Sequence, residues 1–261
     1  MITEEQCVEF LQDGATLVDD LIPMDIIDIA LKGMDKLYSG DRKSGIIGYA
    51  ENDGLAQIYQ CESLEIAAKA VLRAEEVEFI SAATLHTLPS DAEEWIYDDA
   101  GLHVDIQYNR DELDSTPVKM SIMFMVFLDD VEKNCAPTVV SPGSHQLIAD
   151  HLGSQVAFKE SPTNIKDLPD LDFRDMIPVT GKKGQVSIST TSLLHGGSNN
   201  TTDHSRKLLF IAFAPKGLNL RFNINREQDR LEFLERLYDC FPENRKYIVE
   251  STIASLKANG H

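Results

Sequence analysis

The sequence has little of what marks a secreted, disulfide-linked or membrane-spanning protein. No apolar run approaches the length of a membrane span, and the acidic N-terminal stretch lacks the apolar segment of a signal peptide. The four cysteines lie far apart and form no CxxC pair, which argues against a disulfide framework and against a zinc knuckle. They are Cys7, Cys61, Cys135 and Cys240. We therefore expect a reduced, cytoplasmic setting.

Positive charge is also scarce. The chain carries 24 Lys and Arg residues against 43 Asp and Glu residues, which gives a formal net charge of -19. Nucleic-acid backbones and anionic membrane surfaces are bound through clustered Lys and Arg, and no basic run is present. We expect neither as a partner. The acidity favours a cationic or zwitterionic small molecule instead.

Apolar residues, by contrast, are plentiful. They make up 43 % of the 261 residues, enough to bury a full core. This length suits one large β-type domain with helical additions, and no internal repeat or low-complexity linker divides the chain. We expect a single domain over residues 1–261.

The order of local patterns predicts a mainly β fold with flanking α-helices. Residues 1–75 read as helical, with Thr3 as an N-cap and a stop at Asp13-Gly14. From residue 77 to about 220, short segments rich in β-branched and apolar residues are bounded by Gly, Pro, Asn and Asp, which favours an antiparallel sandwich or barrel. Helical spacing returns from about 226 to 258. The helices at both ends are expected to pack on one outer face of the β core.

Within the β region, LHVD places His103 and Asp105 two residues apart. On a strand, residues i and i+2 project from the same face. An imidazole and a carboxylate on one face are two legs of a facial triad, which leaves open positions on a six-coordinate Fe(II). The alternative is a surface pair, or an aspartate hydrogen-bonded to a nearby amide.

A third leg requires a histidine from a distant strand, and His195 is the best candidate. It ends an apolar strand and precedes Gly196 and Gly197, which permit a close backbone approach. Arg206 follows at the start of the next strand, where a guanidinium inside a barrel can hold a carboxylate bidentately. The alternatives are a histidine that caps a turn and an exposed arginine.

Several stretches resemble the phytanoyl-CoA dioxygenase (PhyH) family of Fe(II)/2-oxoglutarate-dependent oxygenases, and the resemblance covers most of the chain. TEEQCVEFLQDGATLVDDLI is similar to the family's N-terminal helix, Asp-Gly break and strand. LHVD matches the HxD motif, and NCAPTVVSPGSH resembles the stretch that ends in Pro-Gly-Ser/Thr-His. His195, with Arg206 eleven positions later, matches the distal histidine and the cosubstrate arginine.

The resemblance implies a double-stranded β-helix, also called a jelly roll, which is cupin-like. It implies that His103, Asp105 and His195 bind Fe(II). It further implies that Arg206 pairs with the C5 carboxylate of 2-oxoglutarate and that O2 is consumed.

Two positions depart from the family pattern. A serine is common two residues after the distal histidine, but here Gly197 holds that position and Ser198 follows. An aromatic residue near the cosubstrate is replaced by Met125. Thr84 or His86, which share one face of the upstream strand, can supply the missing hydrogen bond. For His86 the alternative is a core histidine satisfied by a neighbour.

The reaction expected from the resemblance is hydroxylation of an unactivated C–H bond with release of succinate and CO2. Related halogenases have Gly or Ala in place of the carboxylate that Asp105 supplies here, so halogenation is disfavoured. Desaturation, epoxidation and ring formation stay open. Few basic residues are available for the phosphates of coenzyme A, which favours a small polar or natural-product substrate. The residues expected to face it are Trp95, Tyr97, Gln107 and Tyr108, with Trp95 alternatively a packing residue of a lid.

Two other functions remain open at this point. A cupin-like metal-dependent isomerase or dioxygenase would keep the metal but have no use for Arg206. A non-catalytic jelly-roll binding module would need neither the metal nor the arginine. The oligomeric state is left open.

Overall fold

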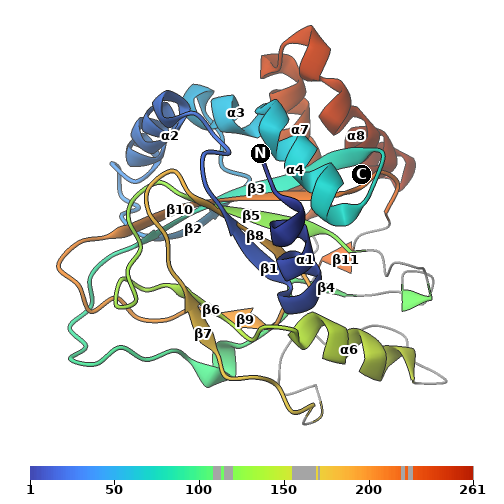
Figure 1. Cartoon of the computed structure of the whole chain (residues 1–261). Coiled ribbons are helices and arrows are strands. Elements are labelled where there is room, and N and C mark those ends of the chain that lie inside the picture. Colours follow the sequence, from blue (N-terminus) through green and yellow to red (C-terminus); the bar gives the residue numbers. More distant parts are fainter. Residues whose placement is uncertain are drawn as a thin grey trace.

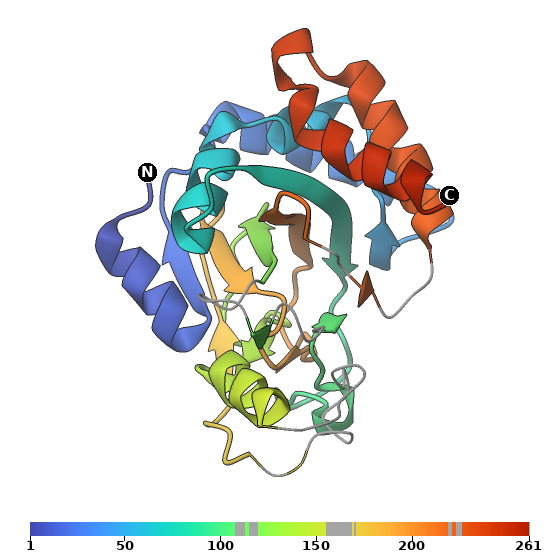
Figure 2. The same cartoon turned by 90° about the vertical axis from the view of Figure 1, so that its right-hand side faces the viewer.

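In a computed structural model of the chain, two antiparallel sheets face each other and most helices cover the outer face of the larger sheet (Figure 1). The residues described are 1–107, 113–114, 120–154, 169, 171–218, 221–222 and 226–260. Figure 2 shows the strands curving around a common interior, as in a jelly roll. The antiparallel sandwich or barrel expected from the sequence is confirmed.

The larger sheet has six strands in the order β1-β8-β5-β10-β3-β2, and each neighbouring pair is antiparallel. A three-stranded sheet has the order β7-β6-β9, and β11 pairs with β4. The strands are β1 (Ala15–Val18), β2 (Gly45–Gly48), β3 (Val77–Thr87), β4 (Ile106–Gln107), β5 (Ile122–Phe127), β6 (Thr138–Val140), β7 (Ile177–Val179), β8 (Val186–Thr190), β9 (His195–Gly196), β10 (Arg206–Pro215) and β11 (Arg221–Phe222).

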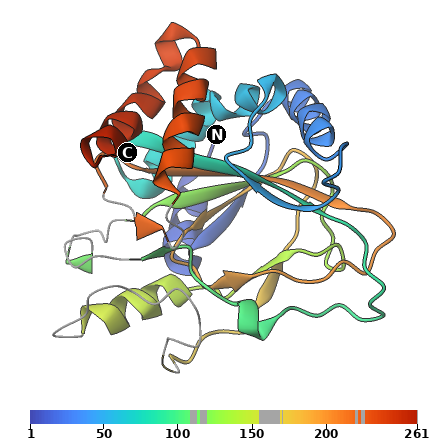
Figure 3. The same ribbon diagram turned by 180° about the vertical axis from the view of Figure 1, so that it is seen from behind.

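The helices belong mostly to the two ends of the chain. They are α1 (Glu4–Asp13), α2 (Met24–Leu37), α3 (Asp53–Tyr59), α4 (Glu62–Leu72), α6 (Ser144–Gly153), α7 (Glu227–Cys240) and α8 (Tyr247–Ala258), with short 3-10 turns at Asp99–Gly101 and Glu243–Arg245. Seen from behind, α7 and α8 lie together above the large sheet, whereas α6 lies beside the small sheet (Figure 3). The terminal helices therefore cover one outer face, as expected.

The main core fills the space between the large sheet and these helices. Phe79 of β3 packs edge-on against Phe213 of β10, and both are fully buried. Tyr59 of α3 and Phe233 of α7 approach Phe79 from the helical side. Burial of large aromatic side chains of this kind supplies much of the stabilisation of such a layer.

Strand alternation divides the large sheet into a helix-facing side and an interior side. On β10, Leu209 and Ile211 belong to the main core under the helices, whereas Leu208 and Phe210 belong to a separate interior cluster. Arg206 has the same parity as Leu208, so its side chain enters the interior. The same alternation assigns a side to the residues paired with β10 between Arg206 and Ala212, where the pairing with β3 is regular.

Local sequence signals explain where the first helix begins and ends. The Thr3 side chain accepts from the Gln6 backbone N–H, and the Gln6 side chain accepts from the Thr3 backbone N–H, which forms a capping box. Gly14 closes α1 with φ of 81°, and a Cβ there would lie 2.6 Å from the His145 ring. Glycine is therefore required for both conformation and space.

A buried ion-pair network joins α4 to the C-terminal helices. The Glu65 carboxylate lies 2.7 Å from the Arg245 guanidinium, 2.7 Å from the Lys69 ammonium and 2.6 Å from the Tyr247 hydroxyl. Burial tends to raise the pKa of Glu65, but the hydrogen bonds from these partners outweigh it and hold the pKa below its usual value. The network therefore keeps Glu65 ionised.

Replacing Glu65 with alanine is expected to lower the free energy of unfolding by about 3–5 kcal/mol, because the Arg245 charge would stay buried without its carboxylate partner. Urea unfolding followed by circular dichroism measures this loss. Glu62→Ala, an exposed glutamate on the same helix, is the control and should cost less than about 1 kcal/mol. Equal effects of the two changes would mean that the network contributes nothing specific.

Among the described residues, no helix is both long and apolar enough to cross a bilayer.

Candidate metal centre and cosubstrate pocket

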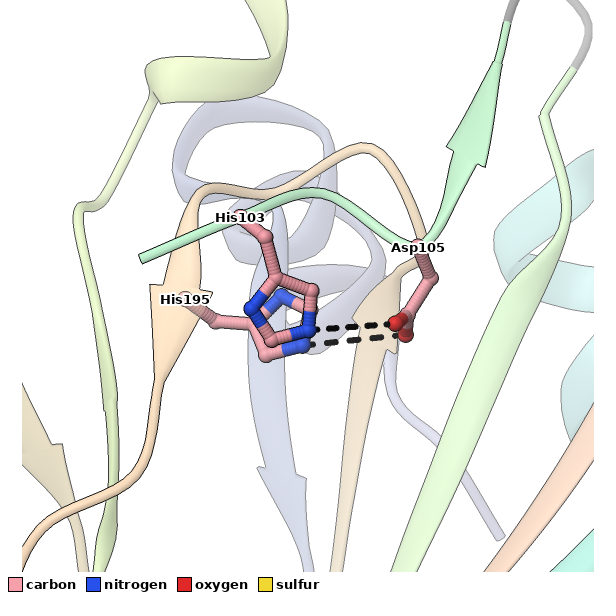
Figure 4. Close-up of side chains that lie close together, drawn as sticks. All are labelled: His103, Asp105 and His195. Atoms are coloured by element: carbon pink, nitrogen blue, oxygen red, sulfur yellow. Dashed lines mark ion pairs between the residues drawn. The ribbon is translucent and has the colours of Figure 1, made fainter. Parts of the chain in front are cut away.

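Backbone hydrogen bonds bring His103, Asp105 and His195 together from two distant segments. The His103 amide donates to the His195 carbonyl at 2.9 Å, and the His195 amide donates back at 3.0 Å. The Asp105 amide donates to the Thr191 carbonyl at 2.9 Å. This antiparallel bridge sets the three side chains on one face, which is the arrangement expected from the HxD spacing (Figure 4).

The three side chains present their ligand atoms to one point. Asp105 Oδ1 lies 3.6 Å from His103 Nε2, and Asp105 Oδ2 lies 3.7 Å from His195 Nε2. One ligand atom from each residue lies within 4.8 Å of the others (Figure 4). Between 21 % and 41 % of each side chain stays exposed, so the cluster opens to solvent and can admit further ligands. Two imidazoles and one carboxylate with open positions form the donor set of a non-haem Fe(II) centre.

The second nitrogen of each imidazole is engaged by the backbone. His103 Nδ1 lies 2.8 Å from the Gly101 carbonyl, and His195 Nδ1 lies 2.9 Å from the Leu193 carbonyl. A carbonyl can only accept, so each Nδ1 carries the proton in the neutral ring and each Nε2 keeps its lone pair. Metal-binding histidines are oriented in this way. Both the positions of the three side chains and the tautomers of the two histidines therefore suit the binding of a divalent cation.

Electrostatic interactions within the cluster shift the pKa values of His103 and Asp105. The interaction with Asp105 raises the pKa of His103, although burial acts in the opposite direction. Burial alone would raise the pKa of Asp105, but His195 and His103 outweigh it and hold that pKa below its usual value. Asp105 is thus ionised at neutral pH and provides the negative charge that a cation needs.

Arg206 is a buried cation whose neighbours leave it unpaired. The residue is 3 % exposed, and its Nε and Nη1 atoms are buried without a hydrogen-bond partner among the described residues. Burial lowers its pKa to about 10, which still leaves it charged at neutral pH. An uncompensated buried charge is costly, so an anion that pairs with the Arg206 guanidinium would be stabilised there.

The interior around Arg206 is mostly apolar. Met125 and Phe127 of β5 and Leu208 of β10 form a buried cluster on the same side of the sheet. Cys135, which is fully buried, also lies near the guanidinium, and burial raises the pKa of its thiol. These side chains exclude water, which strengthens any pairing between Arg206 and a carboxylate.

Comparison with known proteins agrees with this geometry. The model of the phytanoyl-CoA dioxygenase (PhyH) family matches residues 10–208, about three-quarters of the chain. The chain belongs to the PhyH family. No curated protein matches its sequence.

Solved structures similar to this PhyH member include two proteins of nogalamycin biosynthesis and EctD. The carbocyclase SnoK from nogalamycin biosynthesis has a TM-score of 0.65 at 13 % identity, covering 88 % of this chain and 90 % of its own. The epimerase SnoN from the same pathway has a TM-score of 0.60 at 16 % identity, covering 82 % and 83 %. EctD from S. alaskensis, solved with 2-oxoglutarate and 5-hydroxyectoine, has a TM-score of 0.60 at 18 % identity, covering 86 % and 81 %. The shared fold is the jelly roll expected from the sequence.

Thr84 and His86, two candidates for binding the cosubstrate, lie on the helix-facing side of β3. The Thr84 hydroxyl lies 3.1 Å from the hydroxyl of Tyr38, at the end of α2, and the His86 ring packs edge-on against the Tyr38 ring at 5.0 Å. Burial lowers the pKa of His86, although a backbone group of Lys43 acts in the opposite direction, and both ring nitrogens are buried. His86 pairs with Lys207, whose parity is opposite to that of Arg206. Strand register, which the sequence does not reveal, thus directs both side chains away from the interior.

Ser198 is occupied by other groups. Its hydroxyl donates to the Pro137 carbonyl at 2.6 Å and accepts from the Trp95 indole at 3.1 Å. It therefore fastens the loop that follows His195 and does not replace the family serine absent at Gly197. Met125, the residue that stands where some family members have an aromatic one, lies in the interior cluster with Phe127 and Leu208.

Two of the four candidate substrate residues, Trp95 and Tyr97, lie away from the metal cluster. Trp95 and Tyr97 pack on Leu102 and Leu194, which directly precede the two histidines and therefore face the opposite side of the small sheet. Trp95 therefore packs against an apolar cluster on that side. Gln107 lies in β4, opposite Arg221, with a side chain outside the described set, and Tyr108 lies outside the described residues.

Sequence reasoning missed the carbonyls of Gly101 and Leu193 and the proximity of Cys135 to Arg206. The carbonyls precede their histidines by two residues, but a backbone contact of this kind leaves no signal in residue identity. Cys135 lies in a loop, and only the fold brings it beside β10.

Proposed function

We propose that this PhyH member is an Fe(II)/2-oxoglutarate-dependent oxygenase that hydroxylates a C–H bond of a small polar or natural-product molecule. The proposal is carried by two sites that both face the interior of the jelly roll, the metal cluster and Arg206. A cluster of two imidazole Nε2 atoms and one carboxylate fits Fe(II), and the unpaired guanidinium of Arg206 fits the distal carboxylate of a dicarboxylic cosubstrate.

Each residue has a distinct role in this proposal. His103, Asp105 and His195 hold Fe(II), and the Gly101 and Leu193 carbonyls fix the two imidazoles. Bound Fe(II) with 2-oxoglutarate supplies O2 activation for C–H oxidation, with succinate and CO2 as coproducts. Arg206 binds the C5 carboxylate and thereby sets the direction from which the 2-oxo acid approaches the metal.

The neighbouring structures support iron and 2-oxoglutarate as cofactor and cosubstrate, and a small molecule as substrate. SnoN was solved with Fe3+, alpha-ketoglutarate and nogalamycin RO, and HygX from Streptomyces hygroscopicus with nickel and 2-oxoglutarate. EctD was solved with 5-hydroxyectoine. An epimerase and a carbocyclase occur among the neighbours, so the fold is compatible with reactions other than hydroxylation. Hydroxylation is therefore proposed in addition to the general oxygenase class. The scattered cysteines support a cytoplasmic setting, and the lack of a low-complexity linker supports a single domain. The scarcity of basic residues supports a function without nucleic acid or membrane.

Two alternatives account for less of the site. A cupin-like isomerase or dioxygenase without 2-oxoglutarate leaves the buried charge of Arg206 without a purpose. A non-catalytic module leaves two histidines oriented as metal ligands without a purpose.

Thermal stabilisation by Mn(II) and N-oxalylglycine, a stable analogue of 2-oxoglutarate, separates the three functions. Ligands that bind only the folded state stabilise it by mass action, by about 2.7 kcal/mol at a hundred times Kd. We expect Mn(II) to raise Tm and N-oxalylglycine to raise it further only when Mn(II) is present. A response to metal alone favours the cupin-like function, and no response favours the non-catalytic module.

A further inference from the structure

A carboxylate bound by Arg206 needs a second donor. A carboxylate offers about four lone-pair sites on its two oxygens, and one guanidinium edge satisfies two of them. In an interior closed by apolar side chains, an unsatisfied acceptor is costly. A further hydroxyl or amide beside Arg206 is therefore expected, and Thr84, His86 and Ser198 do not provide it.

Thr87 is the direct cross-strand partner of Arg206 in the β3–β10 ladder. The preceding pair, His86 and Lys207, points to the helices, where His86 contacts the ring of Tyr38. By alternation, Thr87 and Arg206 both point to the interior. Directly opposed residues of an antiparallel pair have Cβ atoms about 4.5–5.5 Å apart, so the two side chains enter the pocket together.

The Thr87 hydroxyl is available to an incoming ligand. The side chain is half-buried, and in the described part of the chain its hydroxyl has no hydrogen-bond partner. Its interior neighbours Leu85, Phe127 and Leu208 are apolar and offer no donor. The β-branched side chain also has few rotamers, so little conformational entropy is lost when it binds.

We propose that Thr87 is the second residue that binds the C5 carboxylate of 2-oxoglutarate, donating its hydroxyl from β3 while Arg206 holds the carboxylate from β10. The inference rests on the proposed function. It supplies the hydroxyl that the sequence lacks at Gly197. The competing group is the Cys135 thiol, which is a weaker donor than a hydroxyl.

Calorimetric titration of the Mn(II)-loaded protein with 2-oxoglutarate and with oxalate tests this assignment. Oxalate chelates a metal but has no distal carboxylate. Thr87→Val is expected to raise the Kd for 2-oxoglutarate about tenfold or more, as loss of a hydrogen bond to a charged group does, and to leave the Kd for oxalate unchanged. Thr87→Ser keeps the hydroxyl and should stay close to the wild type.

Thr84→Val is the matched control, since it makes the same change on the opposite face of β3. It should lower Tm, because Tyr38 loses a partner, and leave both Kd values unchanged. The proposal is overturned if Thr87→Val leaves the Kd for 2-oxoglutarate unchanged, if the Kd for oxalate rises equally, or if Cys135→Ala alone produces the selective loss. A wild-type protein that binds Mn(II) and oxalate but not 2-oxoglutarate contradicts the proposed function itself.

Discussion

Replacing Arg206 with methionine is expected to stabilise the ligand-free protein and to abolish its affinity for 2-oxoglutarate. Arg206 is 3 % exposed and has two nitrogens without partners among the described residues, so its charge is unfavourable in the ligand-free protein. Exchanging a buried ionic group for a well-packed apolar one is often neutral or stabilising by about 1–4 kcal/mol. Losing the charge partner of a buried carboxylate costs about 3–5 kcal/mol, equivalent to a loss of affinity of at least a hundredfold.

Differential scanning calorimetry of the ligand-free protein and calorimetric titration of the Mn(II) form measure the two effects. Lys207→Met is the matched control at the next position, on the opposite face, where the ammonium lies 2.8 Å from the Asp35 carboxylate. It should leave the affinity for 2-oxoglutarate unchanged and should not raise Tm. If Arg206→Met retains normal affinity for 2-oxoglutarate, another residue holds the carboxylate.

Replacing His195 with alanine is expected to abolish metal-dependent succinate formation while the fold survives. Loss of a group that hydrogen-bonds to a metal ligand weakens metal binding about 10–100-fold, and loss of the ligand itself should exceed this. The fold should persist because the backbone bridge between His103 and His195 does not involve the imidazole.

Equilibrium dialysis against Fe(II) under anaerobic conditions, together with a succinate assay, measures the outcome for His195→Ala. The control is His204→Ala, since that histidine is exposed and contacts Asp203 at the surface. It should bind metal as the wild type does. Succinate formation that survives in His195→Ala would refute the assignment of this histidine as a ligand.

Two residues of the metal cluster could be predicted from the sequence by short-range geometry. His103 and Asp105 share a face by the two-residue period of a strand, and an apolar strand followed by two glycines marked His195. Arg206 followed in the same way, as a cation at the start of a strand that is otherwise apolar. That His195 and Arg206 belong to the same site depends on contacts between distant strands, and the resemblance to the PhyH family supplied this step.

The rest of the pocket depends on register between strands, which the sequence did not reveal. A shift of one residue moves every side chain of a strand to the other face. Thr84 and His86 therefore face the helices, and Thr87 faces the interior. The placement of Trp95 depends on contacts with Ser198 and Leu194, about a hundred positions away in the chain, which no local pattern encodes.

Anaerobic titration of the metal-free protein with Fe(II) and then with 2-oxoglutarate, followed by visible absorbance, tests the central claim most directly. We expect Fe(II) to bind first. Addition of 2-oxoglutarate should then produce a weak visible charge-transfer band that saturates at equimolar cosubstrate. Iron binding without such a band would contradict the 2-oxoglutarate assignment and the role of Arg206. Absence of iron binding would contradict the metal centre at His103, Asp105 and His195.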